Sequence, residues 1–256
     1  MKLAAFEGLY DGEKNAGLVA MGIMNPAKQP GDNNDPFLLE IRVPGLLSLL
    51  ANRELGTFVP GINDLVYGNK DENIMGVQEK IDRGAFAIHQ LGLYKEAKKN
   101  GNEPAAAAAL ARFNQHKDYL GFGHLGKPEE AVPPVALTFY SFHVMVILGG
   151  LFILVFLAFL HYAYRNALAD KKWLHLAGIA SMFLGYIASQ AGWIVAEVGR
   201  QPWAIQDLLP VTVARSNLSA GTVQTTFFLF LILFTALLIA EIKIILKQIK
   251  IGPEEA

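Results

Sequence analysis

Hydrophobic residues are distributed unevenly along the chain. Residues 1–133 are polar and rich in Gly, Pro, Asn and Lys, whereas residues 134–248 carry most of the apolar side chains. A helix needs about 20 mainly apolar residues to cross a bilayer. Three segments meet this length, at about 135–164, 173–197 and 223–245. The pattern predicts an all-α membrane protein in which three transmembrane helices follow a polar, partly helical loop domain, with the boundary at residues 133 and 134.

Positive charge gathers at two places beside these segments. The basic residues are Arg165, Lys171 and Lys172 after the first segment, and Lys243, Lys247 and Lys250 toward and beyond the end of the third. The loop 199–222 carries only two arginines. Cytoplasmic loops of membrane proteins are enriched in Lys and Arg. We therefore expect a multi-pass membrane protein with a cytoplasmic C-terminus, in which residues 1–133 and 199–222 face the opposite side, the periplasm in a bacterium.

The polar part is predicted to consist of loops and helices. Residues 25–36 form a turn-rich linker, and the apolar segment 37–50 is interrupted by Pro44 and too short to span a membrane. Segment 71–100 has helical periodicity. Its expected apolar face comprises Ile74, Val77, Ile81, Phe86, His89 and Leu93. The Ala-rich run after Pro104 also favours a helix, and we interpret both helices as a soluble cap rather than as catalytic elements.

Composition adds two limits. Hydrophobic residues make up 52% of the chain, charged residues 18%, and the net charge is −1, so nothing points to a nucleic-acid partner. The chain has no cysteine, which excludes disulfides, zinc–thiolate sites and iron–sulfur clusters held by this chain alone. No secretory signal follows Met1. A periplasmic domain without an export signal leads us to expect further sequence upstream, in a longer protein or in a second chain.

The second apolar segment carries a polar and aromatic stripe. Its members, at helical spacing, are Tyr186, Gln190, Trp193, Glu197 and Arg200. Such a stripe is costly against lipid, so we expect it to face protein, water or a cofactor. Two interpretations remain open: Glu197 is a proton carrier or metal ligand, or it forms a structural ion pair with Arg200 within an interfacial belt of tryptophans.

The first apolar segment offers His143 and Met145. These residues lie about 200° apart around a helix and cannot serve one haem together. Ser141, Met145 and Gly149 are spaced four apart and form a face of small residues around a thioether, which allows a helix or a flat macrocycle to approach. A methionine in an apolar helix is more often a packing residue than a haem ligand. Near the start of the chain, Lys2 and Glu7 bracket a short apolar helix start that carries no chemical signal by itself.

Five segments together resemble subunit I of the cytochrome bd quinol oxidases. They are KLAAFEGLY (2–10), VPGLLSLLANRELGTFVPGINDL (43–65), FHVMV (142–146), GWIVAEVGRQPWAIQDLLPVTVA (192–214) and SNLSAG (216–221). GRQPWAIQ is the most specific of these motifs. The resemblance covers nearly all of this chain but only the C-terminal half of such a subunit, namely its quinol-binding loop (Q loop) and last three transmembrane helices.

The resemblance implies roles for particular residues. Lys2 and Glu7 match the quinol-binding residues of the Q loop, Met145 the axial ligand of the low-spin haem b iron, and Glu197 the ligand of the high-spin haem b iron. Trp193 matches a residue among the haems, so Glu197 and Trp193 are the expected catalytic residues. Arg200, Gln201 and Trp203 belong to the motif near the haem propionates, which suits the forked guanidinium of arginine. His143 stands where the family has an arginine, and no residue matches the family's histidine ligands to the low-spin haem b and haem d.

The implied function is that of part of a terminal respiratory oxidase. Such an enzyme oxidises quinol at the periplasmic face and passes electrons through haems b (the b558 and b595 types) to haem d, where O2 becomes water. The implied partners are the membrane, quinol, O2, subunit II, small single-span subunits and the N-terminal half of subunit I, and we expect this chain alone to be inactive. The alternative is a remnant membrane anchor or assembly module without a cofactor. A di-haem b dehydrogenase anchor is disfavoured because only His143 lies deep in a predicted span.

Overall fold

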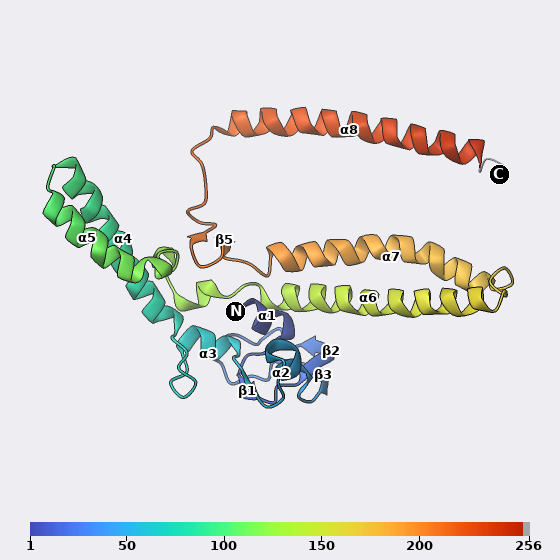
Figure 1. The fold of residues 1–256 in the computed structure, drawn as a ribbon, viewed down its shortest axis with the longest axis horizontal. Helices are drawn as coiled ribbons and strands as arrows, with labels where there is room; N and C mark the ends of the chain where they lie inside the picture. Colours follow the sequence, from blue (N-terminus) through green and yellow to red (C-terminus); the bar gives the residue numbers. More distant parts are fainter. Residues whose placement is uncertain (253–256) are drawn as a thin grey trace. The chain divides into compact units, whose positions relative to one another are not determined.

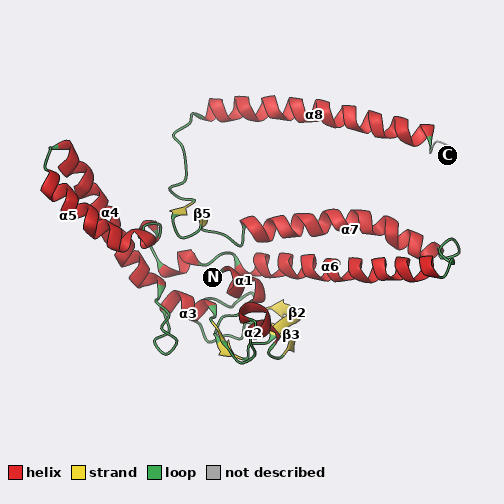
Figure 2. Cartoon of the chain, viewed as in Figure 1, coloured by secondary structure: helices red, strands yellow, loops and turns green. Residues whose placement is uncertain are grey.

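The computed structural model describes residues 1–252 and contains two compact units, residues 1–214 and the remainder from Arg215. Three helices are long and apolar enough to cross a membrane: α6 (Val135–Tyr164), α7 (Lys172–Glu197) and α8 (Ala220–Ile251). Figures 1 and 2 show that helices dominate the chain. The predicted fold class is confirmed, and the predicted spans match these helices except that α8 is longer at both ends.

Helices α6 and α7 form an antiparallel pair in the first unit. They lie side by side along their length and are joined by the basic turn at residues 165–171 (Figure 1). Pro134 directly precedes α6, where the missing N–H of proline costs nothing because the first helical N–H groups have no partner in the helix. In the second unit, Ser219 caps the start of α8, and its hydroxyl accepts a hydrogen bond from the Thr222 N–H.

The polar part folds as a small mixed domain followed by a helical hairpin. The domain contains α1 (Lys2–Glu7), β1 (Glu13–Lys14), β2 (Leu18–Met24), β3 (Phe37–Val43), α2 (Leu46–Asn52), β4 (Phe58–Val59) and α3 (Ile62–Tyr67). The hairpin consists of α4 (Val77–Lys99) and α5 (Glu103–His116), followed by 3₁₀ turns at Lys117–Tyr119, Phe122–His124 and Pro128–Ala131. After α7, the chain forms the short hairpin β5 (Trp203–Ile205) and β6 (Leu209–Pro210).

The expectation of loops and helices alone in the polar part was wrong, because it also contains strands. Strands β2 and β3 pair antiparallel, and the predicted linker at residues 25–36 is the loop that connects them. Met21 pairs with Ile41, and Ile23 pairs with Leu39. All four side chains face outward and are more than half exposed. Because apolar residues occupy the outer face as well as the inner one, the polar–apolar alternation that reveals a strand is missing.

The predicted apolar face of α4 was right at Val77 and Ile81, which pack in a buried cluster, and wrong farther along the helix. Phe86 and Leu93 are 41% and 40% exposed, whereas Gly84, Ala87 and Gln90 are buried. The middle of the buried side carries the small residues Gly84 and Ala87, against which α5 and the 3₁₀ turns pack closely. The helix also begins at Val77 rather than near residue 71. The predicted helix after Pro104 is confirmed as α5, where the Asn102 side chain accepts a hydrogen bond from the Ala105 N–H.

Two apolar clusters hold the first unit together. The larger joins the small mixed domain to the beginning of α6, and its most deeply buried members include Ile62, Val66 and Phe139. The smaller comprises Val77, Phe122, Leu125, Ala131 and Trp203, and it joins α4 and the 3₁₀ turns to the loop after α7. Both clusters lie at the end of the α6–α7 pair where the polar domain begins.

Candidate functional site

Helix α1 packs directly on the first turns of α6. The Phe6 ring stacks on the Phe142 ring with centroids 4.4 Å apart, and Ala4 and Ala5 of α1 are buried. Gly8 ends α1 in the left-handed conformation (φ 62°), which glycine adopts without steric cost. The short helix is therefore anchored three residues before Met145 on α6.

Glu7 lies at the buried end of α1. Its side chain is only 2% exposed, and its Oε2 accepts a hydrogen bond of 3.4 Å from the Val19 N–H. Burial raises the pKa of the Glu7 carboxyl to about 7, although the Val19 N–H and the positive charge of Arg42 favour the carboxylate. Glu7 can therefore exchange a proton near neutral pH.

His143, on α6, contacts Val19 of strand β2. Its Nε2 lies 2.7 Å from the Val19 carbonyl oxygen, and its Nδ1 lies 2.9 Å from the carbonyl oxygen of Phe139, one turn earlier. Both nitrogens face carbonyl oxygens, of which a neutral ring can donate to only one, and the ring is buried. Val19 thus connects Glu7, through its N–H, with His143, through its carbonyl. His143 thus connects α6 to β2.

Lys2 reaches the end of α7. Its ammonium group donates to the Ala196 carbonyl oxygen at 3.4 Å, among the last carbonyl groups of the helix. A positive charge is favourable at a helix C-terminus because of the helix dipole. Five residues along α1 place Lys2 and Glu7 about 140° apart around the helix. The structure does not bring these two side chains together, and each instead contacts a different element.

The polar stripe of α7 lies on the exposed side of the helix. Trp193 is 64% exposed, and the Glu197 and Arg200 side chains are 49% and 39% exposed. An Arg200 nitrogen contacts Glu197 Oε2 at 2.5 Å, so the structural ion pair is present. The Gln201 amide donates to the Glu197 carbonyl oxygen at 3.5 Å. Glu197 Oε1 has no hydrogen bond to any residue among 1–252, so one carboxylate oxygen remains available to a ligand.

Met145 lies against α7 at Gly192. Its sulfur is 3.1 Å from the position that a Cβ at residue 192 would occupy, and the side chain is half-buried. A soft thioether such as that of Met145 is chemically suited to hold a haem iron. In contrast, Trp203 is 3% exposed, and its ring packs against Phe122 at 4.8 Å. Trp203 therefore holds the loop that follows Arg200.

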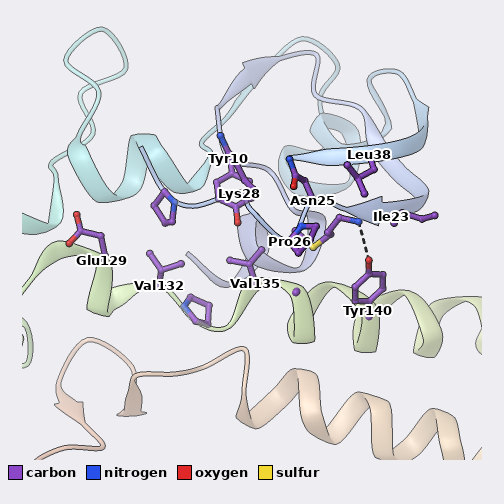
Figure 3. A pocket seen from close by; sticks show the side chains of 14 residues that line it. Tyr10, Ile23, Asn25, Pro26, Lys28, Leu38, Glu129, Val132, Val135 and Tyr140 are labelled. Carbon is purple, nitrogen blue, oxygen red and sulfur yellow. Dashed lines mark hydrogen bonds between the residues drawn. The ribbon is translucent and has the colours of Figure 1, made fainter. Parts of the chain in front are cut away.

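A cleft of about 640 Å³ lies between the small domain and the beginning of α6 (Figure 3). The Tyr140 hydroxyl, on α6, accepts a hydrogen bond of 3.0 Å from the Met24 N–H. The Lys28 side chain is 2% exposed, and its ammonium contacts Asp32 at 2.8 Å and lies 4.9 Å from the centre of the Tyr10 ring. The sequence does not predict this cleft, because segments that are distant in the sequence form it and no local motif marks it.

The comparisons with known proteins identify the family. The sequence profile of cytochrome bd terminal oxidase subunit I matches residues 1–253. The chain belongs to the cytochrome bd subunit I family. It is 30% identical over 270 residues to cytochrome bd-II ubiquinol oxidase subunit 1 of Escherichia coli (strain K12), covering 99% of this chain and 49% of that protein. It is 34% identical over 124 residues to cytochrome bd ubiquinol oxidase subunit 1 of Bacillus subtilis (strain 168), covering 48% of this chain and 26% of that protein.

A solved structure supports the same fold. The bd oxidase from Geobacillus thermodenitrificans superposes with a TM-score of 0.59 at 23% identity, covering 98% of this chain and 42% of that one. The resemblance expected from the five sequence segments is therefore confirmed at the level of family and fold. The chain spans about half the length of the Escherichia coli relative, and the part that matches the Bacillus subtilis relative covers about a quarter of that protein.

Proposed function

We propose that this chain forms part of subunit I of a terminal respiratory oxidase that oxidises quinol and reduces O2 to water. The packing of α1 carries this proposal. Phe6 of α1 stacks on α6 three residues before Met145, and Lys2 of the same helix contacts α7 next to Glu197. Helix α1, which carries the residues proposed to bind quinol, thus packs against the segments of α6 and α7 that carry the residues proposed to bind haem iron. Electrons would have only a short path between substrate and cofactor.

Glu7 and Lys2 would act on quinol, which loses two protons when it is oxidised. The Glu7 carboxyl, whose pKa burial raises to about 7, can accept a phenolic proton and release it at neutral pH. The Lys2 ammonium would stabilise the negative charge that develops on the quinol oxygen. The Lys2 and Glu7 side chains contact different elements and do not point toward each other. We therefore propose that the quinol ring lies across α1 and not in a space between these two side chains.

Met145 and Glu197 would hold the two b-type haems. The Met145 thioether would hold the low-spin haem b, and the Glu197 carboxylate would hold the high-spin haem b. When bound, the haems supply one-electron redox chemistry. Arg200 has five N–H donors, so it can retain its contact with Glu197 and still donate to a propionate together with Gln201. Trp193 would line the space between the haems, and Trp203 would support this loop from the core.

The remaining parts of the oxidase would come from other segments. We place residues 1–133 and the loop 199–222 in the periplasm and the C-terminus in the cytoplasm of a bacterial inner membrane, following the positive charge beside α6 and α8. The other half of subunit I would supply the histidine ligands, including that of haem d. Subunit II and small single-span subunits would complete the enzyme.

Replacing Lys2 or Glu7 with Ala in the assembled oxidase tests the quinol site. We expect each variant to lose at least about tenfold in quinol oxidation, because a general base or charge-stabilising group contributes this much or more. An artificial electron donor should still reduce the haems at the normal rate. Lys14→Ala and Glu54→Ala, which alter exposed residues of the same domain, serve as matched controls. Unchanged quinol kinetics in both test variants would contradict the assignment.

A further inference from the structure

The α6–α7 pair contains two series of residues at seven-residue intervals. On and directly after α7 they are Gly178, Gly185, Gly192 and Gly199, and on α6 they are Thr138, Met145, Phe152 and Phe159. A seven-residue interval keeps side chains on one stripe of a helix that winds around a neighbour. Glycines on such a stripe let two membrane helices approach closely.

The two series meet in reverse order, as the antiparallel arrangement requires. A Cβ at residue 178 would lie 3.1 Å from the Phe159 ring, and a Cβ at residue 192 would lie 3.1 Å from the Met145 sulfur. A Cβ at residue 199 would lie 3.1 Å from the Thr138 methyl group. Residue 185 differs, because a Cβ there would meet no atom within 4 Å. Gly192 is therefore needed for space, whereas Gly185 is not.

We propose that Gly192 is a positioning residue that sets where the Met145 sulfur lies; this inference rests on the proposed role of Met145 as a haem ligand. Non-bonded carbon atoms and sulfur pack at about 3.5 Å or more, so a methyl group at 192 would push the sulfur away by a few tenths of an ångström. The flexible methionine side chain can make this movement with little loss of packing. A ligand bond tolerates only about 0.2 Å, so ligation is more sensitive than packing.

The same stripe also contacts the proposed quinol-binding residue. A Cβ at residue 199 would lie 3.3 Å from Cε of Lys2, whose ammonium contacts the Ala196 carbonyl. Seven residues of helix rise about 10 Å. Gly192 on α7 and Gly199 just after its end thus lie beside the Met145 thioether and the Lys2 stem. The proposed haem ligand and the proposed quinol-binding residue therefore both contact this end of the α7 segment.

The test compares Gly192→Ala with Gly185→Ala in the complete oxidase purified from its own membranes. We expect Gly192→Ala to shift the midpoint potential and visible spectrum of the low-spin haem b and to release that haem about tenfold faster, as changes beside metal ligands typically do. Gly185→Ala, on the same helix, should leave the potential, spectrum and haem release unchanged. Equal values for the two variants would overturn the positioning role.

Two further variants separate the possible failures. If Met145→Leu abolishes the low-spin signal while Gly192→Ala matches Gly185→Ala, the proposal about Gly192 is wrong and the haem assignment stands. If Met145→Leu leaves the signal intact, both are wrong. If Gly192→Ala lowers accumulation of the protein, Met145→Ala/Gly192→Ala should restore it, since the double variant removes the side chain that the new methyl group displaces. Equal loss in both would contradict the contact.

Discussion

At the scale of single residues, Val19 connects two groups that the sequence treats as unrelated. Its N–H donates to Glu7, and its carbonyl faces His143, 124 residues away along the chain. A backbone link of this kind leaves no trace in residue types or spacing. The sequence could therefore nominate Glu7 by resemblance, and it could note that His143 replaces an arginine. It could not show that both contact the same residue of one strand.

The buried Glu7 carboxyl predicts a pH-dependent stability. Burial raises the pKa of Glu7 from 4.5 to about 7, so between these values the folded protein binds more protons than the unfolded chain. Stability should be highest below the unfolded pKa and should fall as pH rises toward 7, by about 3 kcal/mol at most. Thermal unfolding of the assembled oxidase at pH 5 and pH 8 measures this change. Glu7→Gln should flatten the profile over this range, and an unchanged pH slope in that variant would exclude Glu7 as its source.

At the scale of helices and strands, the length and continuity of apolar segments were sufficient to predict α6, α7 and α8. A membrane span needs only a long apolar run, and each of these helices contains one. The β2–β3 hairpin was missed because Met21, Ile23, Leu39 and Ile41 make its outer face apolar too. The predicted face of α4 holds at Val77 and Ile81, but farther along Gly84 and Ala87 are buried in place of the large apolar Phe86 and Leu93.

Helix α4 provides a prediction with a control in the same helix. A Cβ at residue 84 would lie 2.2 Å from the Tyr119 carbonyl oxygen and 2.4 Å from the Gly123 nitrogen, so the backbones must separate in Gly84→Ala. We expect this variant to lose about 1–3 kcal/mol of stability through overpacking. Gly92→Ala, where a Cβ would meet nothing within 4 Å, should be neutral or stabilising by up to about 1 kcal/mol. Chemical unfolding of the two variants measures the difference, and equal stabilities would contradict the close packing of α4 on the 3₁₀ turns.

At the scale of the whole molecule, the candidate site is assembled by contacts between distant parts of the sequence. The Lys2 side chain contacts Ala196, 194 residues away, and both apolar clusters lie at the same end of the α6–α7 pair. The resemblance could nominate candidate residues because the motifs that carry them are short and specific. It could not indicate which motifs touch, or that a cleft lies between β2 and α6, because only the folded chain brings these segments together.

Above all, we propose that this chain provides a haem ligand beside a quinol site. The most direct test is the visible spectrum of the complete oxidase after reduction by quinol, compared between the wild type and Met145→Leu. A leucine keeps the volume of the side chain but cannot ligate iron. We predict that the low-spin haem b signal, present in the wild type, is lost in Met145→Leu while the protein still accumulates in the membrane. A variant that retains the full low-spin signal would contradict the account.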